Sequence, residues 1–357
     1  MNVSNYLITW FYAENKDNES FYPQVGGKSS SFYFQKVYWK CIYCFFRSAI
    51  ITNEASIEYL FFTNTNIPTD IDGVNIEQFF RDNNIKVIRK ELSKQVPKDW
   101  YGAWRNQFYI FDILETLKDY SGNHLILDSD CIISESLDNV FNAVNQFGNI
   151  AYNVEGNGVH PINGITQSQM RQLYRNFFNV ESPCEDLFYC GGEIVAIKSA
   201  LIPQALKVFE NIWEKNFIRY QNNEFKLNEE AHFLTLIYYR LGILNNIASK
   251  YIKRLWTTKI YDNVKKKDLD KYIILHLLSE KQDGFVKLFH YFQRHNTITK
   301  ANMYRKIDQF IFLRHPLIRK LKKHIMQNII YRRILKYLSF LSNHSKYWRQ
   351  NRNKVDD

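Results

Sequence analysis

The 357-residue sequence predicts an α/β fold, in which a mixed, mostly parallel β-sheet is flanked by helices. Short apolar runs alternate with longer helix-forming stretches along most of the chain, the order that builds strand–helix–strand units. The run at residues 125–127 is aliphatic without polar alternation, as in strands buried on both faces of a parallel sheet. Abundant aromatic residues, 24 Tyr and 27 Phe, with only 13 Gly and 7 Pro exclude a disordered chain.

Each expected element follows from a local pattern. Short runs rich in aromatic and β-branched residues predict strands, at residues 6–12, 59–63, 85–88, 125–133, 149–153, 194–197 and 272–276. Longer stretches with an apolar face predict helices, at residues 31–51, 76–81, 104–117, 137–147, 170–178, 201–220 and 228–239. In the third of these helices, Phe108, Phe111 and Leu114 recur at three-residue spacing.

The strand expected at 125–133 carries two carboxylates, Asp128 and Asp130, one residue apart. Residues i and i+2 of a strand point to the same side, so both carboxylates face one way if strand geometry continues through them. At this separation they repel each other unless a cation lies nearby, and Mg²⁺ or Mn²⁺ shared with a diphosphate would relieve the repulsion. A strand that simply ends in an acidic turn is the alternative. In parallel α/β sheets, ligands bind beyond the carboxyl ends of the strands, where this pair is expected.

This strand-Asp-x-Asp pattern resembles the metal and nucleotide-sugar signature of the GT-A glycosyltransferases, and the layout of residues 1–285 is similar to theirs. Within that group the chain resembles glycosyltransferase family eight, the glycogenin-like and bacterial lipooligosaccharide galactosyltransferases. The resemblance implies a Rossmann-like GT-A domain, Mn²⁺ or Mg²⁺ as cofactor, a UDP-sugar donor, and transfer of a hexose to a glycan or lipid-linked acceptor. The polar segment 155–186 would then help to shape the acceptor pocket.

A late histidine, His276, ends the strand expected at 272–276, and Lys281 follows it. A neutral imidazole complements carboxylates at a manganese-type site. The resemblance implies that His276 joins Asp128 and Asp130 as a metal ligand, with Asp128 near the metal or the donor ribose. It also implies that Lys281 is a cation for the diphosphate. Family eight places its lysine six residues after the histidine with a glycine between, whereas here the spacing is five and the glycine is missing.

Three further residues are candidates for the donor side. Arg105, on the helix before the Asp128 strand, corresponds to an arginine near the donor nucleotide, although an ordinary surface arginine is the alternative. Gly191 and Gly192 precede a strand and suggest close approach of the backbone to a ligand or to another strand. Family eight typically has Asn-Ser/Ala-Gly where this chain has Gly-Gly-Glu, ending at Glu193.

Three glutamates are the candidate catalytic residues. Glu193 matches a glycine-glycine-acid segment of inverting galactosyltransferases, where the acid meets the acceptor; a turn acid paired with a lysine is the alternative. Glu229 and Glu230 open a helix at which family eight commonly has Asp-Gln-Asp. The helix dipole alone also accounts for acids in a first turn. Which of these two points inward is open. Retention against inversion is open too, because the family-eight resemblance implies retention, whereas a glutamate acting as general base implies inversion.

Charge separates the end of the chain from the rest. From residue 301 onward there are 14 basic and 3 acidic residues, while the first 300 residues are neutral at 33 against 33. The sequence predicts a catalytic domain at 1–289 and a basic amphipathic helical region at 290–357, with helices broken near Pro316. Such helices suit an anionic membrane surface, each cation adding about 1 kcal/mol. Packing on the main domain is an alternative, and nucleic acid is not expected because no aromatic binding motif accompanies the charge.

Other features narrow the location and the function class. No secretory signal or bilayer-spanning run is recognised, which predicts a cytoplasmic protein, peripheral on the inner face of the cell membrane. The chain has five cysteines, and Cys41-x-x-Cys44 lacks a matching second pair, which favours buried thiols over a zinc site. Two alternatives stay open: a nucleotidyltransferase acting on sugar phosphates, which needs a glycine-rich basic loop not found after the first strand, and a non-catalytic membrane-docked carbohydrate-binding protein.

Overall fold

The computed structural model describes residues 3–22, 25–53, 57–101, 105–154, 160–180, 185–258, 262–265 and 268–312. The chain forms two compact units, Met1–Ile307 and Asp308–Asp357. Of the second unit, only the short helix η5 (Asp308–Phe312) is described. The division expected at 289/290 falls within α9 (Gly284–Arg294). The basic helices expected beyond residue 312 lie outside the described residues, so they stay a prediction.

The central sheet of the first unit has six strands in the order β5-β4-β1-β6-β9-β8. Their bounds are β1 (Asn5–Phe11), β4 (Ile57–Thr63), β5 (Lys86–Arg89), β6 (Asn123–Leu127), β8 (Asn149–Ile150) and β9 (Ile194–Lys198). Strands β5, β4, β1 and β6 are mutually parallel, whereas β9 runs antiparallel to both β6 and β8. The predicted α/β class with a mixed, mostly parallel sheet is therefore confirmed.

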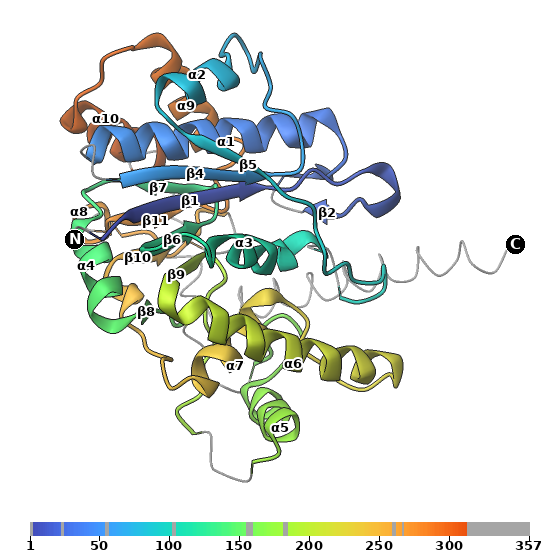
Figure 1. The fold of residues 1–357 in the computed structure, drawn as a ribbon. Helices are drawn as coiled ribbons and strands as arrows, with labels where there is room; N and C mark the ends of the chain where they lie inside the picture. Colours follow the sequence, from blue (N-terminus) through green and yellow to red (C-terminus); the bar gives the residue numbers. More distant parts are fainter. Residues whose placement is uncertain are drawn as a thin grey trace, which may run out of the picture. The chain divides into compact units, whose positions relative to one another are not determined.

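Helices cover both sides of this sheet, with α1 and α2 on one side and α3, α6 and α7 on the other (Figure 1). The α-helices are α1 (Phe32–Thr52), α2 (Ile76–Asp82), α3 (Tyr109–Leu117), α4 (Asp138–Phe147), α5 (Gln167–Phe178), α6 (Ile202–Gln221), α7 (Glu230–Arg240), α8 (Asp268–Lys271), α9 and α10 (Lys300–Ile307). Short 3₁₀ helices are η1 (Lys16–Asn18), η2 (Arg105–Phe108), η3 (Ser199–Leu201) and η4 (Ala248–Lys250). Among the described residues, none of the helices combines the length and the hydrophobicity that a bilayer-spanning segment needs.

Local sequence explains how several helices begin. The Ser31 side chain accepts a hydrogen bond from the Phe34 N–H and caps α1, and Thr166 and Gln169 form a capping box at the start of α5. The helix expected at 104–117 begins as the 3₁₀ turn η2 and continues as α3 from Tyr109. Each of these caps satisfies backbone N–H groups that the first helical turn leaves without an intrahelical partner.

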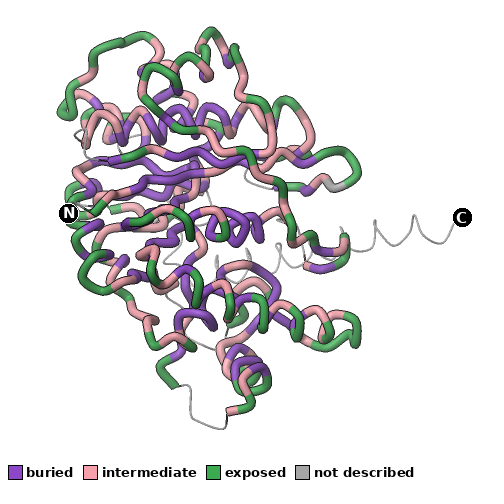
Figure 2. The backbone as a smooth tube through the Cα atoms, in the orientation of Figure 1, coloured by how far each residue is buried: buried purple, intermediate pink, exposed green. Residues whose placement is uncertain are grey.

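The core is rich in aromatic side chains. Strands and the inner faces of the helices are buried, whereas the loops around the rim are exposed (Figure 2). Phe111 of α3 stacks on Phe209 of α6 with ring centroids 3.7 Å apart, and Phe233 of α7 lies 5.6 Å from Phe209. Burial of these three rings fixes α3 and α7, the helices that border the site described below, against α6.

The strand expected at 125–133 is in fact two strands. β6 ends at Leu127, a turn follows in which the Cys131 N–H donates to the Asp128 carbonyl (3.1 Å), and β7 (Cys131–Ile133) enters a second sheet. That sheet has the order β10-β11-β7, with β10 (Ile252–Arg254) and β11 (Ile274–His276). The condition under which strand alternation would align Asp128 and Asp130 is not met, because β6 ends before Asp128 and β7 begins after Asp130.

Candidate functional site

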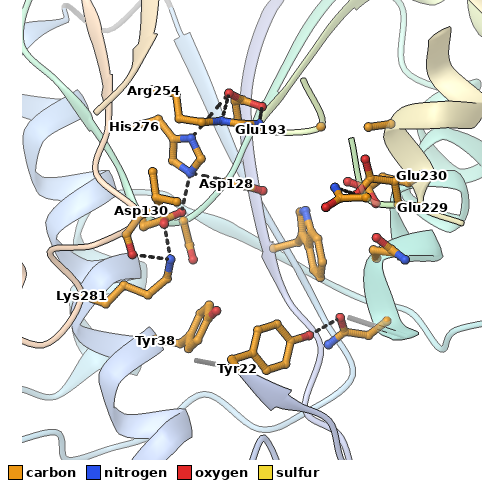
Figure 3. A pocket seen from close by; sticks show the side chains of 18 of the residues that line it. Tyr22, Tyr38, Asp128, Asp130, Glu193, Glu229, Glu230, Arg254, His276 and Lys281 are labelled. Atoms are coloured by element: carbon orange, nitrogen blue, oxygen red, sulfur yellow. Dashed lines mark hydrogen bonds and ion pairs between the residues drawn. The ribbon is translucent and has the colours of Figure 1, made fainter. Parts of the chain in front are cut away.

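Asp128, Asp130 and His276 lie together, although His276 is far from the two aspartates in the sequence. Each offers a ligand atom, and these atoms all lie within 4.8 Å of one another. His276 Nε2 is 3.4 Å from Asp130 Oδ1 and 3.6 Å from Asp128 Oδ2 (Figure 3). The antiparallel pairing of β11 with β7, which sets His276 opposite Cys131, produces this approach.

Lys281, five residues after the end of β11, also lies at this site. Its Nζ donates to Asp130 Oδ2 and lies 3.4 Å from the Leu278 carbonyl, and its side chain is buried. Although burial by itself would raise it, the pKa of Asp130 is held well below its usual range by Lys281 and His276. Burial and the Asp130 charge raise the pKa of Asp128, whose side chain keeps 38% of its surface exposed. The two aspartates therefore differ, since Asp130 is enclosed and Asp128 is only partly buried.

The donor set suits a divalent cation. Both ring nitrogens of His276 are buried and make no hydrogen bond within the described part of the chain; their nearest polar partners are carboxylates, Asp130 and Asp128 for Nε2 and Glu193 for Nδ1. A cation beside Nε2 would satisfy that nitrogen and offset the two neighbouring carboxylates. Two carboxylates with one imidazole fit Mn²⁺, and the carboxylates also fit Mg²⁺.

Behind the imidazole lies an ion pair that the sequence reasoning did not find in full. Arg254 of β10 donates from Nε to Glu193 Oε1 (2.8 Å) and from Nη2 to Oε2 (2.5 Å). Glu193 Oε1 is 3.7 Å from His276 Nδ1, and no part of the Glu193 side chain is exposed. Burial alone would raise the pKa of Glu193, but Arg254 and His276 hold it well below its usual range. A buried ionised glutamate needs partners that compensate its charge, yet nothing in the sequence singles out Arg254 among 47 basic residues.

A pocket with a volume of about 300 Å³ joins these groups to the other predicted acids. Its lining includes Asp128, Asp130, Glu193, His276 and Lys281. Aromatic side chains form much of its wall, among them Trp10, Phe11, Tyr12, Tyr22, Phe34, Tyr38 and Trp256. Residues from the end of β1 and from beyond the end of β6 contribute to it, the place where ligands bind in parallel α/β sheets.

Glu229 and Glu230 lie across this pocket from the aspartates (Figure 3). Glu229 immediately precedes α7, accepts a hydrogen bond from Asn163 Nδ2 and lies 3.4 Å from His232 Nε2. Burial raises the pKa of Glu229 to about 7, and burial with the neighbouring Glu229 raises the pKa of Glu230 well above its usual value. One oxygen of Glu230, Oε2, is buried without a hydrogen-bond partner in the described residues. The pocket thus holds two groups of acids in unlike environments.

The two glycines make space for acids. A Cβ at Gly191 would collide with Glu193 Oε2, and a Cβ at Gly192 would collide with Glu230 Oε1. Gly192 lines the pocket and Gly191 does not. Arg105 is not among the pocket-lining residues either, and its Nη2 donates to the Glu19 carbonyl (3.1 Å). Its predicted contact with the donor therefore stays a prediction.

Four cysteines belong to the described chain, and all are buried free thiols: Cys41, Cys44, Cys131 and Cys190. Burial raises the pKa of the Cys41 and Cys44 thiols, with Lys281 and Asp130 adding smaller opposing effects at Cys41. Such thiols remain protonated and are poor metal ligands. The fifth, Cys184, lies outside the described residues.

Comparisons with known proteins give similarity only to solved structures; no family model and no curated protein matches. The chain is similar to mouse xyloside xylosyltransferase 1 in its apo form, at 12% identity and TM-score 0.44, over 77% of this chain and 97% of that one. It is similar to the apo structure of the bifunctional glycosyltransferase WbbM, at 8% identity and TM-score 0.49, over 86% of this chain and 52% of that one. It is also similar to the apo form of the glycosyltransferase GlyE of Streptococcus pneumoniae TIGR4, at 9% identity and TM-score 0.42, over 85% and 62%.

The chain thus covers less than two thirds of WbbM and of GlyE. Similarity at these identities and TM-scores does not carry an activity from those proteins to this chain. The family-eight resemblance accordingly rests on the motifs in the sequence.

Proposed function

We propose that this chain is a metal-dependent GT-A glycosyltransferase that moves a hexose from a UDP-sugar to a glycan or lipid-linked acceptor in bacterial surface polysaccharide or lipooligosaccharide synthesis. The observation that carries the proposal is the meeting of Asp128, Asp130 and His276 in one pocket at the edge of the central sheet. Residues so distant in the chain converge on a site with the chemistry that the Asp-x-Asp motif implies.

On the donor side, Asp130 and His276 would hold the cation, with Asp128 completing the set or meeting the donor ribose. When bound, a divalent ion supplies positive charge that stabilises the departing nucleoside diphosphate. Lys281, which pairs with Asp130 and lines the pocket, adds a fixed positive charge for the same phosphates. Gly192 lines the pocket, and its lack of a side chain leaves room for Glu230.

On the acceptor side, we assign the acid–base role to Glu229 or Glu230. Arg254 occupies both oxygens of Glu193, which leaves that residue poorly placed to take a proton. The raised pKa of Glu229, about 7, suits a group that exchanges protons near neutral pH. A base must be ionised, so turnover that depends on Glu229 should rise as the pH increases through about 7.

A UDP-sugar panel with and without Mn²⁺ tests the reaction. Release of UDP that requires Mn²⁺, and is lost in Asp130→Asn, is the expected result. Silence across the whole panel would favour the non-catalytic carbohydrate-binding alternative, and release of pyrophosphate from a sugar phosphate with UTP would favour the nucleotidyltransferase. Glu229→Gln and Glu230→Gln then identify the base: the right one abolishes turnover and leaves UDP binding nearly intact.

The membrane assignment is a separate proposal. We propose that the basic region 290–357 holds the enzyme on the anionic inner face of the cell membrane, where a lipid-linked acceptor would be presented. Its support is the sequence pattern of interleaved basic and apolar residues.

A further inference from the structure

Glu193 contacts the candidate metal site with both its side chain and its backbone carbonyl. Its side chain lies against the far edge of the His276 imidazole, with Oε1 3.7 Å from Nδ1, while Nε2 on the opposite edge faces the aspartates. Its backbone carbonyl accepts a hydrogen bond from the Asp128 N–H (3.2 Å). Figure 3 shows the imidazole between Glu193 and Asp130. One residue therefore contacts two of the three candidate ligands, His276 and Asp128.

Arg254 fixes the position of the Glu193 carboxylate. β10 and β11 are parallel, their register pairs Arg254 with His276, and the Leu255 N–H donates to the His276 carbonyl (2.8 Å). Arg254 forms a bidentate salt bridge with the two Glu193 oxygens, which restricts rotation of the carboxylate. The absence of a side chain at Gly191 leaves the volume that Glu193 Oε2 occupies. Arg254 on β10, the pairing of β10 with β11, and the space left at Gly191 thus together fix the orientation of the Glu193 carboxylate.

We propose that Glu193, clamped by Arg254, is a positioning residue that orients the His276 imidazole and thereby sets the affinity of the site for a divalent cation. The inference rests on the metal site of the proposed function and deepens it. A metal-bound histidine usually directs its second ring nitrogen at a carboxylate, which fixes the tautomer and the ring angle and raises the basicity of the ligating nitrogen. Glu193 is the carboxylate on that side of His276.

A direct role for Glu193 with the acceptor fits the geometry less well. Its side chain is fully enclosed, and both oxygens already accept hydrogen bonds from Arg254. A purely structural ion pair is the remaining alternative. That alternative predicts a loss of stability on mutation, whereas positioning of His276 predicts weaker cation binding in the folded protein.

The chain offers a matched control for this distinction. Asp268 is also buried and accepts a hydrogen bond (2.7 Å) from Lys253, the β10 residue next to Arg254. Asp268 also accepts from the Lys265 N–H and is not part of the Asp128–Asp130–His276 group. Asp268→Asn therefore breaks a comparable buried ion pair on the same strand without touching the histidine.

The experiment measures Mn²⁺ binding to the full chain by the loss of the electron paramagnetic resonance signal of free Mn²⁺. We expect Glu193→Gln to weaken Mn²⁺ binding by about 10- to 100-fold, as for other outer carboxylates of metal sites. Asp268→Asn should bind Mn²⁺ as tightly as the wild type, and His276→Ala should show the largest loss. Urea unfolding with EDTA present reports the stability of each variant without the metal.

Wild-type Mn²⁺ affinity in folded Glu193→Gln would overturn the inference, and so would an equal loss in Asp268→Asn. If Glu193→Gln does not fold, Arg254→Lys decides, because it keeps the charge but removes the two-pronged grip and should weaken Mn²⁺ binding too. Different results would contradict the proposed transferase reaction and the positioning role of Glu193. Tight wild-type Mn²⁺ binding without any UDP-sugar turnover removes the proposed reaction and leaves the positioning role standing, whereas a wild type that binds no Mn²⁺ removes the metal site on which both depend.

Discussion

At the scale of a single residue, Gly192 leaves Glu230 the space that it occupies. A Cβ added at Gly192 would collide with Glu230 Oε1. Gly192→Ala should therefore push Glu230 out of place and cost about 1 to 3 kcal/mol of unfolding free energy, the usual range for overpacking. It should also lower turnover, because Glu230 is one of the two proposed acceptor-side acids. Urea unfolding and the UDP-sugar assay measure the two effects.

Gly27→Ala is the matched control for this prediction. The nearest atom to a Cβ at Gly27 is Ser31 Oγ at 3.9 Å, an ordinary contact, so the change should stay within about 0.5 kcal/mol. Equal stabilities for Gly192→Ala and Gly27→Ala would mean that Glu230 has other space available.

Some residues of the candidate site could be predicted from the sequence and others could not. Asp128, Asp130, His276 and Lys281 could be selected because their types and their order along the chain match a known motif, and the structure brings them together. Arg254 could not, because a basic residue on a three-residue strand has no local pattern that separates it from a surface cation. The partner of a buried acid is fixed by strand pairing, which the sequence does not state.

The apolar run on either side of Asp128 and Asp130 shows that hydrophobic periodicity does not always predict the ends of a strand. Both β6 and β7 are fully buried, so the residues on either side of the aspartates look alike in the sequence. Hydrophobicity alone cannot tell one strand through the pair from two strands in different sheets. The turn between them is nevertheless what places Asp130 beside His276, since β7 leaves the central sheet and pairs with β11.

Helix α5 gives a prediction about capping. The Thr166 side chain accepts from the Gln169 N–H and Gln169 reaches back to the Thr166 N–H, which closes the first turn of the helix. Thr166→Ala should lower the unfolding free energy by about 1 kcal/mol, as measured by urea unfolding. Thr166→Ser keeps the hydroxyl and should restore most of it. A serine variant as unstable as the alanine variant would contradict the capping explanation.

The basic C-terminal region gives a prediction about membranes. Residues 313–357 carry 12 basic and 2 acidic residues. Helices α9 and α10 bury Phe289, Phe292, Met303 and Ile307, so a truncation at residue 289 would disturb the core. A chain ending at Phe312 keeps those residues. It should lose most of the full chain's binding to vesicles that contain acidic lipid, since each cation near such a surface contributes about 1 kcal/mol.

Co-sedimentation with liposomes measures this binding, and vesicles of neutral lipid are the control. The full chain should bind the acidic vesicles and not the neutral ones, and circular dichroism checks that the shortened chain is folded. Undiminished binding of the chain that ends at Phe312 would refute the anchor and assign the attraction to the rest of the protein.

At the scale of the whole molecule, the sequence was most informative about the order of elements. Strand and helix alternation was predicted through α7 because each element has its own apolar pattern, as in β4 and α1. The antiparallel entry of β9 beside β6 was not predicted, because pattern fixes which residues face the core and not the direction of a strand. Helix α9 and strand β10 were missed, although Phe285, Leu288 and Phe292 of α9 recur at helical spacing.

Acid should destabilise the whole protein partly through His124 on β6. His124 is fully buried against Tyr6, with Nε2 3.0 Å from the Tyr120 carbonyl, and burial lowers its pKa to about 4. The unfolded chain takes up this proton near pH 6.5 and the folded chain does not. Above about pH 6.5 this histidine is neutral in both states and does not affect stability; as the pH falls toward 4 it lowers the free energy of unfolding by about 3 kcal/mol. Glu229, whose pKa is raised, changes the stability in the opposite direction. The measurement is therefore the difference in unfolding free energy between the wild type and His124→Gln, obtained by urea unfolding at each pH. The glutamine does not titrate, and the gap in stability between the two proteins should change by that amount over this range. A constant gap would mean that His124 is protonated as readily in the folded protein as in the unfolded chain.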